Sequence, residues 1–207
     1  MGWLESIVLG IVQGLTEFLP VSSSGHLVVV PAMVGWEQPE LTFDLVLHLG
    51  TLIAVVFAFR QELWVLALGV VGRGDDPRTA RRLVWLLFLG SIPAAVAGIA
   101  FGSFFEDRFD DPIATCFELL ATAAILLAAE WLIRRGEGHE PVDEKRAGII
   151  GVAQAVAILP GISRSGATIA AGLVTKVSRE DAARYSFLLA IPAIAGAVAT
   201  KVPDVAD

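Results

Sequence analysis

The feature that most constrains the fold is residues 83–105, a stretch that contains no charged residue. At about 1.5 Å per helical residue, a stretch of this length spans the roughly 30 Å hydrocarbon core of a bilayer. A backbone surrounded by lipid must satisfy its own hydrogen bonds, which a helix does. The stretch therefore predicts a membrane-spanning helix, with Pro93 as the site of a kink.

The rest of the chain has the same character. Of its 207 residues, 55% are hydrophobic and 18% are charged, and the net charge of −7 argues against a nucleic-acid partner. The single cysteine, Cys116, excludes disulfides. We expect one all-α integral membrane domain over residues 1–207, a polytopic helical bundle. Its further helices are predicted over residues 3–19, 27–35, 43–71 (as one long tilted helix), 113–133, 147–159 and 185–200.

Basic residues gather in two of the connecting loops, at residues 72–82 and 134–146. By the positive-inside rule both loops should be cytoplasmic. The segment EDRFDD at residues 106–111 lies between them and is predicted to be an acidic loop on the outside. The basic residues that carry this prediction are Arg73, Arg78, Arg81, Arg82, Arg134, Arg135, Lys145 and Arg146.

A polar cluster interrupts the apolar N-terminal region, in the segment LGIVQGLTEFLPVSSSGH at residues 9–26. Gln13 and Glu17 are four residues apart and would share one face of a helix that Pro20 ends. Serines and His26 follow before the next apolar run. Two short helices joined by a polar elbow predict a re-entrant hairpin, because neither helix is long enough to cross a bilayer.

The polar cluster has a second copy. A shift of 141 residues lays Ser22 on Ser163, and each copy consists of a short apolar helix, a proline, a serine cluster and a glycine in that order. The first copy follows an outside segment and the second a cytoplasmic loop. We therefore expect inverted repeats, about 1–105 and 113–207, whose elbows meet near the bilayer midplane. The other matched pairs are Gly10 with Gly151, Gln13 with Gln154, Ser24 with Ser165, and Gly25 with Gly166.

The two elbows together suit a phosphate ester or a pyrophosphate. Glu17, assisted by Gln13, can hold a hard divalent cation that bridges phosphate oxygens. Arg164 can bind two phosphate oxygens at once. The helix that begins near Gly166 offers free N–H groups and the positive end of its dipole. His26 could take a proton from a serine or from water, and its spacing leaves both alternatives open.

The segments EFLPVSSSGH and LPGISRSGAT resemble the motifs of the undecaprenyl-pyrophosphate phosphatases of the BacA/UppP type, integral membrane enzymes that recycle a bacterial lipid carrier. The resemblance implies hydrolysis of a polyprenyl pyrophosphate to the monophosphate and inorganic phosphate. It places catalytic roles on Glu17, Ser23, His26 and Arg164, with Ser23 as the nucleophile. The remaining motif positions, expected to bind the substrate, are Gln13, Ser22, Ser24, Gly25, Gly161, Ser163, Ser165, Gly166 and Thr168.

The same resemblance implies dependence on Mg²⁺ or Ca²⁺, held by Glu17 and Gln13. It also implies a multi-pass protein of the inner (plasma) membrane with a site open to the periplasmic or external side, and a part in cell-wall synthesis and bacitracin resistance. The expected partners are the lipid substrate and the bilayer, and a homodimer is an open alternative. Family members usually extend further, with two more helices after the point where this sequence ends.

Two other functions are compatible with parts of the sequence. A polyprenyl-phosphate transporter or flippase would also use inverted repeats with broken helices at the midplane, but it has less need of a serine together with a histidine. A lipid phosphatase of the acid-phosphatase type shares the Ser-Gly-His sequence. The chain lacks the Lys-x6-Arg-Pro motif of that type, so the diphosphatase is the favoured interpretation.

Overall fold

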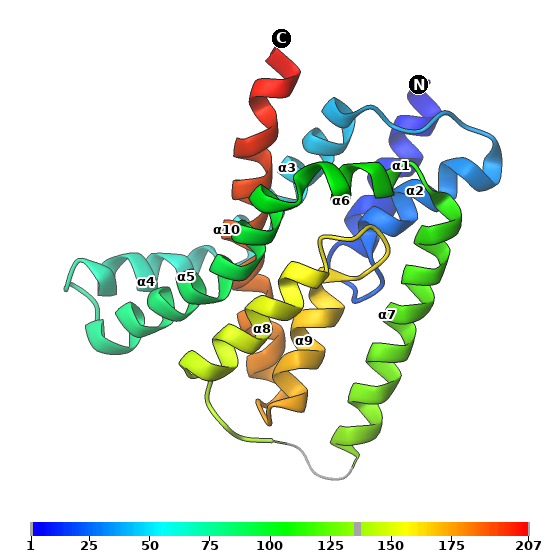
Figure 1. Cartoon of the computed structure of the whole chain (residues 1–207). Helices are drawn as coiled ribbons and strands as arrows, with labels where there is room; N and C mark the ends of the chain where they lie inside the picture. The colour runs from blue at the N-terminus through cyan, green and yellow to red at the C-terminus, as the bar shows by residue number, and fades with distance from the viewer. Residues whose placement is uncertain (1, 135–137, 207) are drawn as a thin grey trace.

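The structure, a computed structural model, describes residues 2–134 and 138–206, and only the backbone at Leu41, Glu106 and residues 201–206. The regular structure of these residues is entirely helical (Figure 1), as predicted. Arg135 lies outside the described residues. The helices are α1 (Trp3–Thr16), α2 (Ser23–Val34), α3 (Leu41–Ala58), α4 (Arg60–Val70), α5 (Pro77–Ala100), α6 (Gly102–Phe109), α7 (Pro112–Ile133), α8 (Glu144–Val156), α9 (Arg164–Val174) and α10 (Arg179–Ala206).

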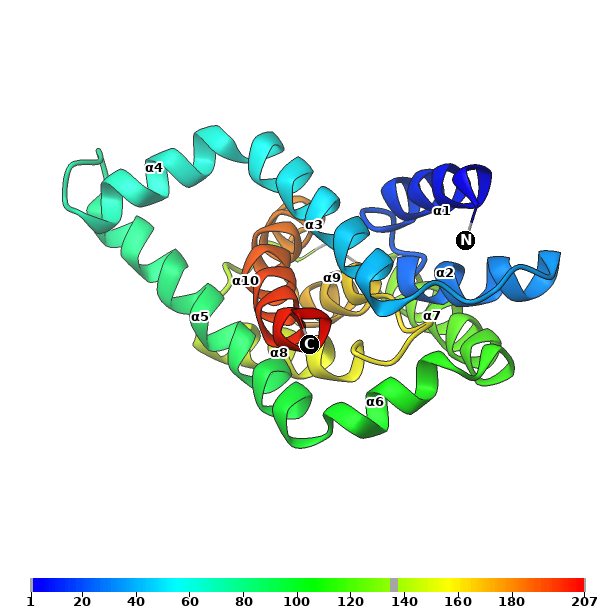
Figure 2. The same cartoon turned by 90° about the horizontal axis from the view of Figure 1, so that it is seen from above.

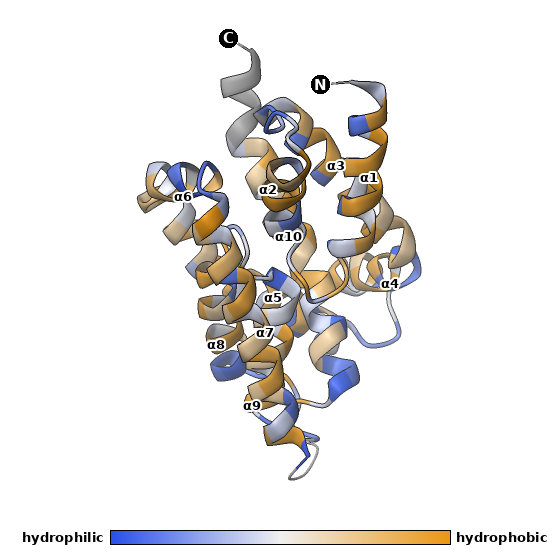
Figure 3. Cartoon of the chain, turned by 90° about the vertical axis from the view of Figure 1, so that its right-hand side faces the viewer, coloured by the Kyte–Doolittle hydropathy of each residue, from blue (hydrophilic) through white to orange (hydrophobic). Residues whose placement is uncertain are grey.

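Several helices are suited to a membrane. Within the described residues, α5, α7 and the Arg179–Thr200 part of α10 are long and apolar enough to cross one, and α3 and α4 pass the same test as a bent pair. Large apolar side chains of α7 point away from the protein, with Phe117 68% and Leu127 72% exposed. Figure 3 shows hydrophobic residues over most of α1 and α7. Outward apolar faces of this kind fit contact with lipid rather than water.

The prediction of one helix over residues 43–71 is wrong. The chain bends by 73° between α3 and α4, at Phe59. The Arg60 guanidinium donates to the Phe57 carbonyl at 2.8 Å and lies 4.5 Å from the centre of the Phe57 ring. A charged side chain thus satisfies a carbonyl that the broken helix leaves without its usual partner.

The helix predicted over residues 83–105 is displaced toward the N-terminus. It begins at Pro77, because the Asp76 side chain accepts a hydrogen bond from the Thr79 N–H at 3.2 Å and proline suits the first helical position. Arg78, Arg81 and Arg82 therefore lie on α5 and not in a loop. At the other end, α5 stops at Ala100.

The prediction of an acidic loop at residues 106–111 is also wrong, since α6 extends through Phe109. Its helical spacing places Arg108 four residues after Phe104, and the guanidinium lies 5.1 Å from the centre of that ring. Asp111 then accepts from the Ile113 and Ala114 N–H groups and begins α7. Two charged side chains of this segment thus serve helices, because Asp111 caps α7 and Arg108 packs against a ring of α6.

Each copy of the repeat forms a pair of short helices, with boundaries shifted from the predicted ones. α1 ends at Thr16, before Pro20, and α2 begins at Ser23, four residues earlier than expected. Ser23, Ser24, Gly25 and His26 consequently form the first turn of a helix. In the second pair, Asp143 accepts a hydrogen bond from the Arg146 N–H at 2.8 Å and begins α8; this bond lowers the pKa of the Asp143 carboxyl.

The core joins α5, α8 and α10. Leu86, Ile150 and Leu189 are buried there, and the Tyr185 hydroxyl donates to the Leu86 carbonyl at 2.6 Å. A Cβ at Gly151 would lie 2.5 Å from the Gly90 carbonyl oxygen, so only glycine permits this approach of α8 to α5. Seen from above, α9 and α10 lie at the centre, with α1, α2 and α7 on one side, α4 and α5 on the other, and α6 running from the end of α5 toward α7 (Figure 2). This core supports the α8–α9 pair.

Candidate active site

The turn between α1 and α2, residues 17–22, is the first elbow. Its last residue, Ser22, has a positive φ of 66°, and its hydroxyl accepts from the Gly25 N–H at 3.3 Å. The same hydroxyl lies 3.3 Å from the Ser24 hydroxyl. Ser22 therefore caps α2 and fixes the direction in which its first turn, with Ser23, leaves the elbow.

The turn between α8 and α9, residues 157–163, is the second elbow. Ser163 accepts from the Gly166 N–H at 3.1 Å and lies 3.3 Å from the Ser165 hydroxyl, as Ser22 does with Gly25 and Ser24. The Thr122 hydroxyl of α7 donates to the Gly161 carbonyl at 2.8 Å and accepts from the Ser163 N–H at 2.9 Å. α7 thus holds the second elbow in place.

The two elbows meet at the centre of the molecule. In Figure 1 the first points down from α1 and α2, and the second points up from α8 and α9. The Ser165 hydroxyl donates to the Leu19 carbonyl at 3.2 Å, across the junction. A Cβ at Gly25 would lie 2.8 Å from the Gly161 Cα, so the backbones of the two pairs are in close contact.

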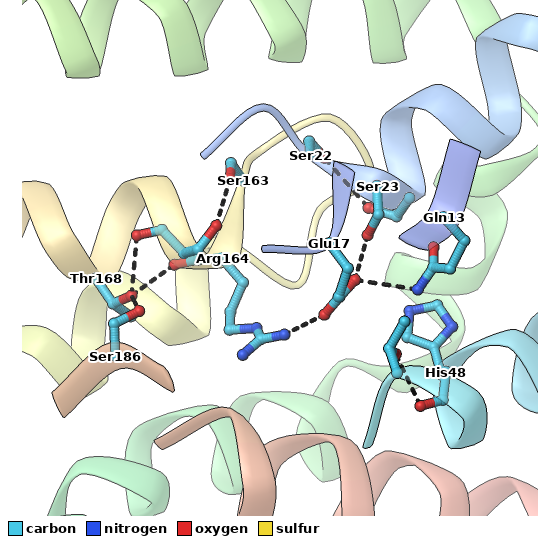
Figure 4. Close-up of polar contacts among 12 residues, drawn as sticks. Gln13, Glu17, Ser22, Ser23, His48, Ser163, Arg164, Thr168 and Ser186 are labelled. Carbon is cyan, nitrogen blue, oxygen red and sulfur yellow. Dashed lines mark hydrogen bonds and ion pairs between the residues drawn. The ribbon is translucent and has the colours of Figure 1, made fainter. Parts of the chain in front are cut away.

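Glu17 is the centre of the polar contacts between the elbows (Figure 4). Its carboxylate pairs with the Arg164 guanidinium through Oε1 and accepts from the Ser23 hydroxyl through Oε2. The Gln13 amide donates to the same Oε2 at 3.1 Å. The side chains of Glu17 and Arg164 are 5% and 18% exposed. A buried carboxylate is thus matched by one positive charge and two neutral donors.

His26 and Thr168 lie near the site but do not contact Glu17 through the hydrogen bonds that they form. The His26 Nδ1 lies 2.7 Å from the Ser22 carbonyl, so it is the ring's donor and leaves Nε2 as the acceptor in the neutral imidazole. The hydroxyl of Ser23 is directed to Glu17 and not to His26. Thr168 is 1% exposed, donates to the Arg164 carbonyl at 2.7 Å and lies 2.6 Å from the Ser186 hydroxyl, so it supports the first turn of α9.

Sequence reasoning missed the supporting hydroxyls Thr122 and Ser186. Each is a buried hydroxyl in an apolar helix, 4% and 1% exposed respectively, and such a residue inside a membrane segment is a signal that a partner is near. His48 of α3 lies near the first helix pair. Its Nδ1 lies 2.9 Å from the Asp44 carbonyl, and Figure 4 shows its ring turned toward Gln13.

Glu17 and Gln13 are the residues of this site that could hold a divalent cation. Among the described residues, no three His, Cys, Asp or Glu side chains come together as a metal-binding group. The Gln13 Oε1 atom, however, is buried and has no hydrogen-bond partner in the described structure, and it belongs to the side chain that contacts Glu17. One carboxylate and one free amide oxygen fit a hard cation that takes its other ligands from water and phosphate.

Comparison with known proteins agrees with the motifs. Residues 6–206 match the family model described as "Bacitracin resistance protein BacA". The chain is 43% identical to the Undecaprenyl-diphosphatase of Marinobacter nauticus, over all of this chain and 78% of that protein. It is 45% identical to the Undecaprenyl-diphosphatase 2 of Stutzerimonas stutzeri, over 94% of this chain and 74% of that protein. Undecaprenyl-diphosphatase of Moorella thermoacetica is 44% identical, over 97% and 76%.

These matches extend over nearly the whole chain and include both elbows. The helical, apolar architecture fits the membrane setting that the composition predicts. The chain therefore belongs to the bacitracin resistance protein BacA family.

Proposed function

We propose that this chain hydrolyses undecaprenyl diphosphate to undecaprenyl phosphate and inorganic phosphate. The name Undecaprenyl-diphosphatase, carried by its relatives, supports this activity, and so does the chemistry of the elbows. The observation that carries the proposal is the contact of Glu17 with Arg164 and Ser23, which brings a positive charge, a carboxylate and a hydroxyl from two distant segments to one point.

Arg164 binds the diphosphate in this proposal. Its guanidinium has five N–H donors, and the contact with Glu17 through one terminal nitrogen leaves others for phosphate oxygens. The hydroxyls of Ser163 and Ser165, and the first N–H groups of α9, surround the same end of the helix. Positive charge and fixed donors stabilise the charge that develops on the transferred phosphoryl group.

Ser23 is the proposed nucleophile. Its oxygen attacks the terminal phosphorus, the bond to the bridging oxygen breaks, and undecaprenyl phosphate leaves. The serine proton passes to Glu17 Oε2, with which it already forms a hydrogen bond. His26, whose acceptor nitrogen is Nε2, then takes a proton from the water that attacks the phosphorus, and Glu17 returns its proton to the Ser23 oxygen as the bond from Ser23 to phosphorus breaks and phosphate leaves. Direct attack by a water that His26 activates is the alternative mechanism.

A Mg²⁺ or Ca²⁺ ion is a further proposal. Glu17 and the free Gln13 Oε1 would hold it, as their chemistry allows. The ion would supply positive charge to the phosphate oxygens.

We also propose a membrane arrangement for the fold. Two repeats, residues 1–105 and 113–207, place their helix pairs α1–α2 and α8–α9 as re-entrant hairpins from opposite faces of the inner membrane. The site opens to the external side. Support comes from the opposed direction of the two elbows in Figure 1 and from the basic residues gathered at 73–82, up to the first turns of α5, and at 134–146, up to the first turn of α8. A homodimer remains a prediction.

The transporter alternative has no support in the comparisons, whose described relatives carry the name of a diphosphatase. An assay in detergent distinguishes the two functions, because transport needs a membrane with two sides whereas hydrolysis does not. Purified chain should release phosphate from undecaprenyl diphosphate there. Movement of polyprenyl phosphate across liposomes without phosphate release in detergent would contradict the proposal.

The order of the chemical steps is tested with Ser23→Ala and His26→Ala measured side by side. If Ser23 is the nucleophile, Ser23→Ala loses roughly 10³-fold or more in kcat, and wild-type enzyme quenched during turnover carries phosphate on Ser23. Near-normal turnover of Ser23→Ala would assign the attack to water.

A further inference from the structure

His48 faces the candidate active site from α3 and has no part in the proposed mechanism. Figure 4 shows its ring turned toward Gln13. The helices that carry these two residues pack together at this level, because a Cβ at Gly10, one turn before Gln13, would lie 3.8 Å from the Leu47 side chain. The His48 side chain is 23% exposed. An ionisable ring that leaves an apolar helix toward buried polar groups is a signal of function in a membrane protein.

One nitrogen of the His48 ring is held in place and the other is left as an acceptor. Nδ1 lies 2.9 Å from the Asp44 carbonyl oxygen, which can only accept, so Nδ1 carries the proton and the lone pair of the neutral ring is on Nε2. The Asp44 carboxylate lies 3.5 Å from the same Nδ1. Histidines that bind metal ions have this arrangement, because a hydrogen bond from one nitrogen to a carbonyl or carboxylate fixes the ring while the other nitrogen binds the ion.

The residues that His48 faces supply oxygen atoms. Gln13 is 1% exposed, and its amide nitrogen donates to Glu17 Oε2 at 3.1 Å. The Gln13 Oε1 atom is buried and has no hydrogen-bond partner in the part of the chain that the structure describes. A carboxylate, an amide oxygen and an imidazole nitrogen are thus carried by neighbouring side chains of the first elbow, α1 and α3. Each of these groups is a ligand that divalent ions accept.

We infer that His48 is a third protein ligand of the divalent cation proposed for Glu17 and Gln13, and that it binds through Nε2. The inference rests on the proposed function, because it takes the cation from that proposal. A nitrogen ligand changes which ion the site prefers. Transition-metal ions such as Mn²⁺ and Co²⁺ bind imidazole nitrogen, whereas Ca²⁺ takes oxygen ligands. His48 therefore favours Mn²⁺ over Ca²⁺ at this site.

Mn²⁺ bound together with methylenediphosphonate, a diphosphate that cannot be hydrolysed, gives the test. Neither component contains nitrogen, so in a nitrogen-free buffer any ¹⁴N coupling to Mn²⁺ in pulsed EPR comes from the protein. Wild-type protein should show this coupling, and growth with ¹⁵N-histidine should remove it. His48→Gln should also lose the coupling and bind Mn²⁺ at least about 10-fold more weakly. Its Ca²⁺ affinity should change little, because the new amide again offers an oxygen.

His26→Gln is the matched control. The His26 ring has the same tautomer, with Nδ1 2.7 Å from the Ser22 carbonyl oxygen, but it is not assigned to the ion. This variant should keep the ¹⁴N coupling. Labelled with ¹⁵N-histidine, it also tests His48 without changing that residue, since the third histidine, His139, lies in the loop between α7 and α8.

Three results would overturn the inference: Mn²⁺ bound to wild-type protein without ¹⁴N coupling, a coupling that His26→Gln removes and His48→Gln keeps, or no Mn²⁺ binding at all. Phosphate release from undecaprenyl diphosphate is measured separately. Wild-type protein that shows the His48 coupling and releases no phosphate would contradict the proposed function and leave the metal ligand in place.

Discussion

The two elbows have the same frame and different functional groups. In both, a serine caps the following helix through the N–H of a glycine three residues later, at 3.3 Å for Ser22 and 3.1 Å for Ser163. In both, the same serine lies 3.3 Å from the serine two positions on. Yet the position of Ser23 in the first copy is Arg164 in the second, and the position of Glu17 is Ile158.

The comparison separates residues that shape the backbone from residues that would act on a phosphate. The caps serve the helices, so both copies keep them. The groups that would act on a phosphate are divided between the two copies. The first helix pair and its elbow carry the carboxylate of Glu17, the Ser23 hydroxyl and the His26 imidazole, and the second pair carries the Arg164 guanidinium. Because Glu17 and Arg164 neutralise each other across the junction, neither copy alone could bury its charge at low cost.

The largest effect is expected when one elbow is given the residue of the other. Arg164→Ser and Glu17→Ile should each lower kcat/KM by roughly 10³-fold or more, since the phosphoryl group loses its charge partner or Ser23 loses its acceptor. Phosphate release measures this loss. Each single change also leaves a buried charge unpaired, at about 3–5 kcal/mol of unfolding free energy.

The double variant Glu17→Gln, Arg164→Gln is the control for folding. It removes both charges together and should recover most of the thermal stability in detergent, without activity. Near-normal turnover in either single variant would contradict the assignment of Glu17 and Arg164 to the active site.

The next largest effect is expected at Gly25. A Cβ there would lie 2.8 Å from the Gly161 Cα and 2.9 Å from Leu119, so Gly25→Ala must push the elbows apart. We expect a loss of about 1–3 kcal/mol of stability and a clear loss of activity. The equivalent change Gly166→Ala meets its nearest atom, in Ser163, at 3.0 Å and should be milder.

Gly14→Ala is the matched control, because a Cβ at Gly14 meets nothing within 4 Å. Alanine there should stabilise α1 by about 1 kcal/mol. Thermal unfolding of the three variants in one detergent makes the comparison. A Gly25→Ala protein as stable and active as wild type would show that the elbows do not need this contact.

The two glutamines that the repeat pairs, Gln13 and Gln154, should respond differently to replacement by leucine. Gln13→Leu removes a donor to Glu17 and should lower activity about 10-fold. Gln154 is 2% exposed, and both polar atoms of its amide lack a partner in the described structure. Gln154→Leu should therefore leave activity unchanged and raise stability by about 1–3 kcal/mol. A loss of activity in Gln154→Leu would assign that amide a ligand.

The smallest effects are expected at the two capping serines. Ser163→Ala should cost about 1 kcal/mol of stability, and Ser163→Gly a few tenths. Ser22 has a φ of 66°, which glycine adopts freely and alanine does not, so the difference between its Gly and Ala variants should be larger by about 1 kcal/mol. Equal differences at the two positions, measured by thermal unfolding, would contradict this role of the backbone.

Local patterns predicted most of the helices. The uncharged stretch at residues 83–105 and the apolar segment at 113–133 became α5 and α7, although α5 is displaced. Predictions failed where a charged side chain met the backbone. Arg60 lies at the break after α3, and Asp76 begins α5 several residues early. Hydrophobic patterning carries no information about such hydrogen bonds.

The sequence by itself determined the chemistry available to this protein: the residue types of the two motifs, their repeat and the apolar helices around them. Tertiary structure decided the partners. It directed the Ser23 hydroxyl to Glu17 and not to His26, placed Thr168 beneath Arg164, and brought Thr122 to the second elbow. Spacing along one helix fixes which residues share a face, whereas contact between segments about 140 residues apart depends on how the whole bundle packs.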